Sequence, residues 1–254
     1  MERAEKHLTE LQADITSYVN SHPYTFKHRK EAKKRPPAYR LGFTRKCDGA
    51  VIGLIAADCI YNIRSGLDHL MAALVPPAHR HSVMFPIFFQ RVWEGPVERE
   101  NGQRAKERQR WKLIEQHAEA AAVDFLKKIQ PPEDAGSDPR GTYALVALNQ
   151  GSNADRHRRL PVISNALQAV TVTWKEADGR VRERTGASGA NEGLEDNAKI
   201  PVPASAKLMA IRGTALVTIR VSDGGELVIP DVLTRMLQTA RITIGQLSPY
   251  VRRP

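Results

Sequence analysis

The chain has 254 residues and a formal net charge of +10. Its composition is that of a globular protein, which excludes wholesale disorder, and its length allows a substantial buried core. Its two cysteines, Cys47 and Cys59, are too few for a disulfide scaffold in a chain of this size. The first six residues are too charged for a signal peptide, and no apolar run reaches membrane-spanning length, so we expect a cytoplasmic protein without a membrane partner.

The positive charge is spread over the whole chain rather than confined to a tail. A field of this sign raises the local concentration of polyanions and speeds their encounter with the protein. We therefore expect RNA or another polyanion as the partner. The alternative is a basic, arginine-rich protein that binds no nucleic acid.

The front of the chain is predicted to be helical, apart from one basic hairpin. Apolar residues recur at helical spacing over residues 4–20 and 51–75, and the second run predicts a central core helix. Between them, residues 24–44 predict an extended hairpin or arm, which either lies along phosphates or is simply solvated. After Pro76-Pro77, residues 83–88 predict a strand or an extended plug against the core, and a charged insert follows over 94–110.

Further helices are predicted over residues 111–128 and from about residue 139, the latter leading into a polar stretch at 149–159. The sequence then alternates with period two, which predicts two β-hairpins, at 170–181 and 216–229, separated by a glycine-rich acidic loop over 186–197. A last helix is predicted to begin at Pro230-Asp231. The predicted fold class is α+β, with a helical bundle and basic arm over 1–159. Antiparallel hairpins and a C-terminal helix follow over 160–254, packed with the bundle as one unit.

Polar residues of the predicted central helix are the main candidates for catalysis. His69 is of the residue type that titrates near neutrality, so it can serve as base or acid toward a ribose 2′-hydroxyl or a leaving oxygen. Arg64 can hold a phosphate with two parallel hydrogen bonds. Asn62 or Asp68 can orient the imidazole and set its tautomer.

Helix geometry separates these groups, because Arg64 and His69 are about 140° apart on a regular helix. Either a partner subunit supplies the second residue, or the helix bends near Gly66, or the residues are structural. In the structural interpretation, Arg64 and Asp68 form an ordinary i, i+4 ion pair, and His69 is a hydrogen-bonded core histidine.

The spacing of Arg64 and His69 resembles the R-x4-6-H signature of the HEPN superfamily of helical-bundle proteins. This resemblance covers at most residues 1–159. It implies a metal-independent endoribonuclease with a composite site at a homodimer interface, no cofactor, and a role as a toxin or in antiviral defence. The blocks 62–69, 85–87 and 155–158 are also similar to those of a set of uncharacterised bacterial proteins that carry them in the same order.

A second polar cluster contains Asp155, His157 and Arg158, which would bind substrate if this segment folds across the central helix. Alternatively, it is a cationic helix end with a capping residue. His79 and His81 could bind a metal together with His69, His157 or Asp155, but no spacing matches a zinc motif, so we predict no metal. Phosphate-binding loops, dinucleotide fingerprints and serine-hydrolase elbows are missing from the sequence. The competing function is a non-catalytic binding or scaffolding protein with a polar ligand pocket.

Overall fold

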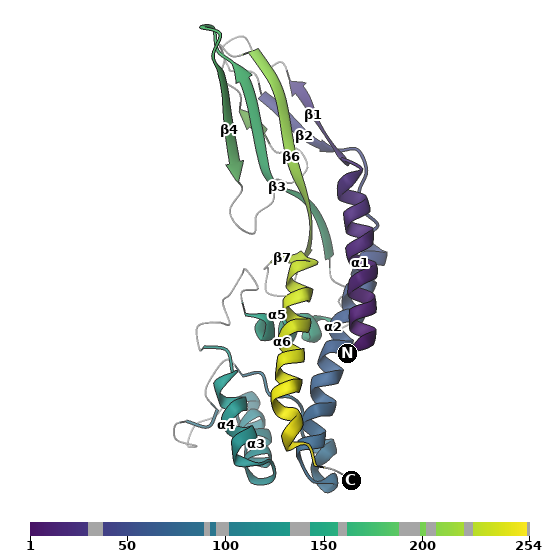
Figure 1. Cartoon of the computed structure of the whole chain (residues 1–254), viewed down its shortest axis with the longest axis vertical. Helices are drawn as coiled ribbons and strands as arrows, with labels where there is room; N and C mark the ends of the chain where they lie inside the picture. The colour runs from purple at the N-terminus through teal and green to yellow at the C-terminus, as the bar shows by residue number, and fades with distance from the viewer. Residues whose placement is uncertain are drawn as a thin grey trace. The chain divides into compact units, whose positions relative to one another are not determined.

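The computed structural model describes residues 1–29, 38–88, 92–94, 102–132, 143–156, 162–187, 199–201, 207–220 and 226–252. Helices and antiparallel strands both occur in it, so the predicted α+β class is confirmed (Figure 1). In chain order the elements are α1 (Glu2–Asn20), β1 (Tyr24–Arg29), β2 (Ala38–Phe43), α2 (Gly49–Leu74), the 3-10 helix η1 (Pro77–Ser82), α3 (Gly102–His117), α4 (Ala120–Lys128), α5 (Ala144–Arg156), β3 (Val162–Lys175), β4 (Val181–Ala187), β5 (Lys199–Pro201), β6 (Lys207–Arg220), β7 (Glu226–Ile229), α6 (Asp231–Leu247) and the 3-10 helix η3 (Ser248–Tyr250).

The chain divides into two compact units, each assembled from separate stretches of sequence. The helical unit contains residues 1–8, 56–160 and 231–254, and the sheet unit contains residues 9–55 and 161–230. This grouping differs from the predicted division at residue 159. Residues 9–20 of α1 and 49–55 of α2 belong to the sheet unit. The C-terminal helix α6 groups with the helices, and the basic hairpin β1–β2 groups with the other strands. Helix α6 and the hairpin each have an apolar face that packs in the core of their own unit.

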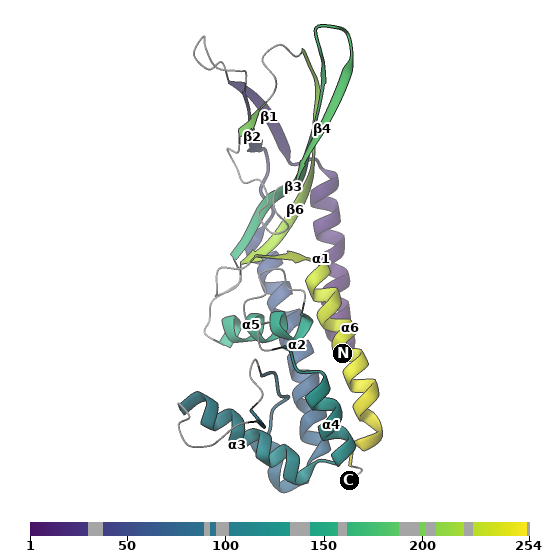
Figure 2. The same cartoon turned by 90° about the vertical axis from the view of Figure 1, so that its left-hand side faces the viewer.

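The helical unit is built on α2 and α6, which run side by side in both views (Figures 1 and 2). Helix α5 lies across α2, and glycine makes this approach possible. A Cβ atom at Gly151 would lie 2.9 Å from the Cδ1 atom of Ile60. The core of this unit combines apolar residues of α2, α3, α4, α5 and α6. Among them are Ile63, Leu67, Met71, Leu74, Trp111, Ile114, Leu126, Leu148, Leu233 and Met236.

Three predicted helix boundaries in this unit are wrong. Helix α3 begins at Gly102, inside the predicted charged insert, and the predicted helix over 111–128 is two helices that separate at Glu119. On one straight helix the buried residues Ile114 and Val123 would lie about 180° apart, so a break lets both reach the core. Helix α5 continues through the polar stretch as far as Arg156.

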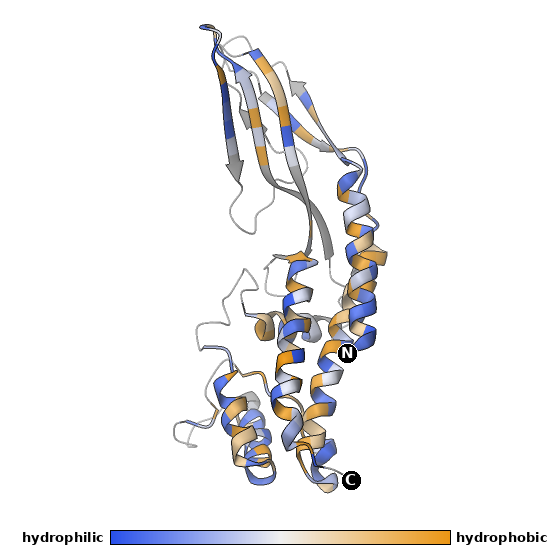
Figure 3. Ribbon diagram, in the orientation of Figure 1, coloured by the Kyte–Doolittle hydropathy of each residue, from blue (hydrophilic) through white to orange (hydrophobic). Residues whose placement is uncertain are grey.

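The sheet unit contains two antiparallel sheets, with strand orders β1-β2-β5 and β4-β3-β6-β7. Both predicted hairpins and the predicted basic hairpin are confirmed as strand pairs. Their inner faces share a core around the buried residues Leu41, Val170 and Val172. After the exposed Val181, the edge strand β4 is hydrophilic (Figure 3), and Arg182, Glu183 and Arg184 are exposed there. Charges on an edge strand discourage pairing with other chains.

Helix α2 is long and apolar enough to cross a membrane, which corrects the expectation that no segment reaches that length. Half of its most apolar window is buried within the protein. The core helix of a soluble protein passes the same test of length and composition.

Several predicted features lie outside the described residues. They are the run of cations and prolines over 30–37, most of the acidic loop beyond residue 187, and the substrate-binding candidates His157 and Arg158. Asp155 belongs to the last turn of α5, but its side chain is not among those described.

Cys59 is the more protected of the two thiols, and this protection can be measured. Its side chain is fully buried, it donates a hydrogen bond to the carbonyl of Ala4 (3.4 Å), and burial raises its pKa from 9.0 to about 12. At pH 8 this shift reduces the thiolate fraction about a thousandfold. We therefore expect iodoacetamide to alkylate the half-buried Cys47 and to spare Cys59, as peptide mass spectrometry would show.

The raised pKa of Cys59 also predicts how the unfolding free energy depends on pH. Between pH 9 and pH 12 the unfolded chain loses the Cys59 proton while the folded chain keeps it, so the contribution of this thiol to stability falls as the pH rises. Replacement of Cys59 by alanine should therefore weaken the dependence of the unfolding free energy on pH between pH 9 and pH 12.

In the labelling experiment, equal alkylation of both cysteines in the folded protein at pH 8 would contradict the burial of Cys59.

Candidate functional site

Arg64 and Asp68 of α2 both form hydrogen bonds with the backbone of one residue in the extended segment 83–88. The guanidinium Nη2 of Arg64 donates to the carbonyl of Phe85 (2.7 Å), and the backbone N–H of Phe85 donates to Oδ1 of Asp68 (2.8 Å). The two side chains also form an ion pair, with 3.2 Å between Nη2 and Oδ1. We call this arrangement the Phe85 clasp. The predicted i, i+4 ion pair is therefore confirmed, and both of its members also hold backbone.

The clasp explains why segment 83–88 is a plug rather than a strand. Phe85, Ile87 and Phe88 are buried, so their backbone polar groups need partners other than water. The side chain of Gln130 supplies further hydrogen-bond partners for this backbone. It accepts a hydrogen bond from the N–H of Phe88 (2.9 Å) and donates one to the carbonyl of Pro86 (3.2 Å). Side chains thus replace the neighbouring strand that this segment lacks among the described residues.

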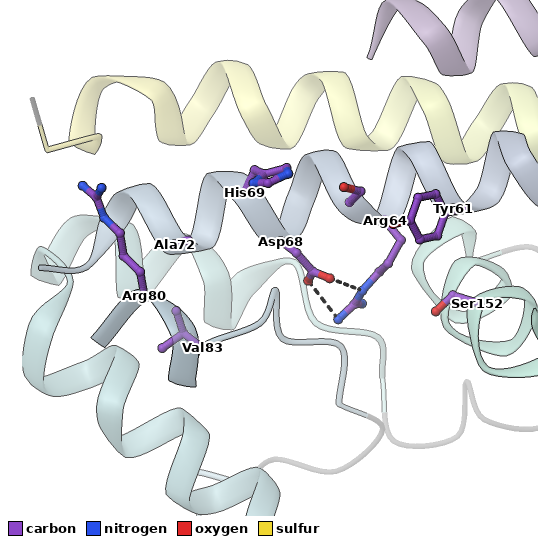
Figure 4. A pocket seen from close by; sticks show the side chains of 9 residues that line it. Tyr61, Arg64, Asp68, His69, Ala72, Arg80, Val83 and Ser152 are labelled. Carbon is purple, nitrogen blue, oxygen red and sulfur yellow. Dashed lines mark hydrogen bonds and ion pairs between the residues drawn. The ribbon is translucent and has the colours of Figure 1, made fainter. Parts of the chain in front are cut away.

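A cavity of about 450 Å³ opens beside the clasp, along α2 (Figure 4). Its volume falls within the range of small-ligand sites. The charged groups in its wall are Arg64, Arg80 and Asp68, which sum to one positive charge, and a protonated His69 would add a second. The remaining lining residues are Tyr61, Ser65, Ala72, Val83 and Ser152. The cavity therefore suits an anionic group that can also accept hydrogen bonds from hydroxyls.

His69 is exposed at this cavity, and no described residue forms a hydrogen bond with its ring. The interpretation of His69 as a hydrogen-bonded core histidine is therefore wrong. Figure 4 shows the imidazole on a different side of α2 from Arg64 and Asp68, in agreement with helix geometry. In a single chain, Arg64 and His69 line one cavity without pointing toward each other.

Neither predicted partner forms a hydrogen bond with the imidazole. Asp68 is engaged in the Phe85 clasp, and the side-chain amide of Asn62 donates to the carbonyl of Asp58 (2.6 Å), one turn earlier in α2. Of the four predicted catalytic residues, Arg64, Asp68 and His69 line the cavity, and Asn62 does not.

Helix α5 brings residues just before Asp155 to the cavities along α2. Ser152 lines the large cavity, while Asn149 and Asn153 line a smaller one of about 130 Å³, which Phe85 also borders. Arg64 borders both cavities.

The sequence-based predictions missed Tyr61, Arg80 and Ser152 as lining residues. Arg80 reaches the cavity because Pro76-Pro77 ends α2 and η1 turns the chain back, and local patterning gives no signal of such a return. The two histidines beside Arg80 show no metal-binding arrangement. The ring of His79 stacks on that of His117, with centroids 3.8 Å apart, and the described residues contain no cluster of three metal-binding side chains.

The clasp makes a stability prediction. Asp68→Ala would leave the Arg64 guanidinium and the Phe85 N–H without their carboxylate partner, which costs about 2–4 kcal/mol of unfolding free energy. Asp58→Ala, at an exposed position of the same helix, is the matched control and should change stability by less than about 0.5 kcal/mol. Urea unfolding measures both. Equal, small effects of the two substitutions would show that the clasp contributes little.

Comparisons with protein-family models, with curated proteins and with solved structures find no match to this chain. The likeness to the HEPN superfamily therefore rests on the residues already named. A functional assignment has to be argued from the cavity along α2 and from the groups that line it.

Proposed function

We propose that this protein is a metal-independent endoribonuclease of the HEPN type that binds an RNA phosphate in the cavity along α2. The observation that carries the proposal is the exposed imidazole of His69, which borders a positively charged cavity and has no hydrogen-bond partner among the described residues. Such a group is open to a proton from substrate. A role as a toxin or in antiviral defence follows from the resemblance alone.

The proposed reaction needs no group from outside the protein and the RNA. His69 accepts the proton of a ribose 2′-hydroxyl, whose oxygen forms a bond to the adjacent phosphorus. The bond from phosphorus to the 5′-oxygen of the next nucleotide then breaks, and that oxygen takes a proton from an acid. The products are a 2′,3′-cyclic phosphate and a free 5′-hydroxyl. The exposed Arg80 is placed to balance the charge of the phosphate in the cavity.

Among the described residues, one chain offers a single imidazole at this cavity, whereas the reaction uses a base and an acid. The resemblance to HEPN proteins implies a homodimer, and we propose that His69 of a second copy supplies the acid. Arg64 is engaged by Asp68 and Phe85, so we assign it a positioning role. It fixes segment 83–88 and thereby the wall of the cavity.

A second candidate function is supported by what surrounds His69. Asn62 and Asp68 are held by other groups, so no described side chain orients the imidazole, and catalytic histidines usually have such a partner. A binding protein has no need of this orientation. In that case the cavity retains an anionic ligand without turnover.

His69→Gln separates the two candidates. If the protein is a ribonuclease, cleavage of a fluorescent single-stranded RNA in EDTA should fall about 100-fold or more, because general acid–base catalysis contributes that much. His81→Gln is the control, since His81 is also exposed but does not line the cavity. A 2′-deoxy strand of the same sequence should resist cleavage by every variant, because it lacks the nucleophile.

Folded His69→Gln protein that cleaves RNA at the parental rate would refute the ribonuclease proposal. Absence of cleavage by the parent, together with phosphate binding that His69→Gln weakens, would support the binding protein instead. Melting temperatures of the variants verify that each one is folded.

A further inference from the structure

Three cations occupy one row of the sheet β1-β2-β5. In the strand register, Lys27 of β1 is the direct partner of Arg40 in β2, and Arg40 is the direct partner of Lys199 in β5. Lys199 is far from the other two in the sequence, so only the fold creates this row. We call these three residues the cationic row.

The side chains of Lys27 and Arg40 lie away from the core of the sheet unit. Side chains alternate between the two faces of a strand, and the neighbours of Lys27 and Arg40 on the opposite face belong to the hydrophobic core. Phe26 and Leu41 are among them. Lys27 is exposed, and Arg40 is half-buried. The sheet is therefore amphipathic, with an apolar inner face and a cationic outer face.

The charges of the row are not balanced within the sheet. The three strands contain no aspartate or glutamate. No described residue forms an ion pair with Lys27 or Arg40, and the Nε atom of Arg40 is buried without a hydrogen-bond partner among the described residues. Like charges at directly opposed positions of a sheet destabilise it. An anion bound across the row would remove that repulsion.

We infer that the outer face of the sheet β1-β2-β5 binds the phosphate backbone of single-stranded RNA. Neighbouring strands are about 4.8 Å apart, so the row extends over roughly 10 Å and exceeds the size of one phosphate group. Successive phosphates of a nucleic acid strand fit such a line of cations better than a free phosphate does. Aromatic side chains of this sheet, such as Tyr24 and Phe26, pack against the core instead of offering stacking surfaces. Binding is therefore electrostatic and indifferent to base sequence.

This inference does not depend on RNA cleavage at the α2 cavity. The cationic row belongs to the sheet unit, and the cavity belongs to the helical unit. A chain that cleaves nothing can still bind RNA on this face, and a nuclease can lack the binding. The experiment below measures binding alone, so that its failure and the failure of the proposed function are distinguishable.

The test uses the full chain and a fluorescein-labelled 20-nucleotide strand that is 2′-O-methylated and so cannot be cleaved through its 2′-oxygen. Fluorescence anisotropy gives the Kd from 25 to 200 mM salt. Lys27→Gln/Arg40→Gln should weaken binding about tenfold or more at the lowest salt. It should also reduce the slope of log K against log salt by about 1.4, because each phosphate contact on a single strand contributes about 0.7.

Lys112→Gln/Lys128→Gln removes the same charge from exposed positions in α3 and α4 and is the matched control. It should leave the slope within experimental error of the parental value. Lys27→Gln alone, at an exposed position, should lower the slope by about half as much as the double variant, which provides a second reading if Arg40→Gln unfolds the sheet.

Three results would overturn the inference. The first is unchanged affinity in folded Lys27→Gln/Arg40→Gln protein, and the second is an equal loss in the control variant. The third is binding of polyglutamate of matched charge as tightly as RNA with the same dependence on Lys27 and Arg40, which would indicate an acidic protein partner. Affinities that agree for strands of different base sequence would support a contact with the phosphate backbone.

Discussion

The Phe85 clasp is the interaction on which the arrangement of the helical unit depends. Two side chains one turn apart on α2 satisfy both backbone polar groups of a buried residue that lies 17 and 21 positions further along the chain. The clasp fixes an extended segment against the core without a neighbouring strand among the described residues, and its Arg64 borders both cavities. Because Arg64 and Asp68 are committed to it, the groups left for a ligand are His69, Arg80 and the hydroxyls around them.

Positive charge is organised differently in the two units. In the helical unit it lines a cavity with a single carboxylate, which suits one anionic group held close to an imidazole. In the sheet unit it forms a row without any carboxylate, which suits a longer anion. The proposed ribonuclease would use the first for chemistry and the second to retain the strand. Each proposal stands on residues of its own unit and is tested without the other.

The sequence is informative where interactions are local. The apolar stripe of α2, the Arg64–Asp68 pair and the hairpins follow from spacings of two to four residues, and all were predicted. Local sequence patterns do not predict contacts between residues that are distant in the sequence. Phe85 as the target of the clasp, Arg80 in the cavity wall and Lys199 beside Arg40 depend on chain reversals without a local pattern. The break at Glu119 was missed because Ile114, Ala121 and Phe125 would share one face of a continuous helix, although Val123 would fall on the opposite face.

The central claim is that His69 is open to an anionic ligand while Arg64 is held by the protein. Nitrogen-15 NMR of both side chains during titration with uridine 3′-monophosphate tests it most directly, since the nucleotide carries a phosphate beside a ribose 2′-hydroxyl. We expect the ring nitrogens of His69 to shift with ligand concentration, while the Nε–H of Arg64 keeps the signal of a group bonded to Asp68. A shift of Arg64 with an unchanged His69 would contradict the account.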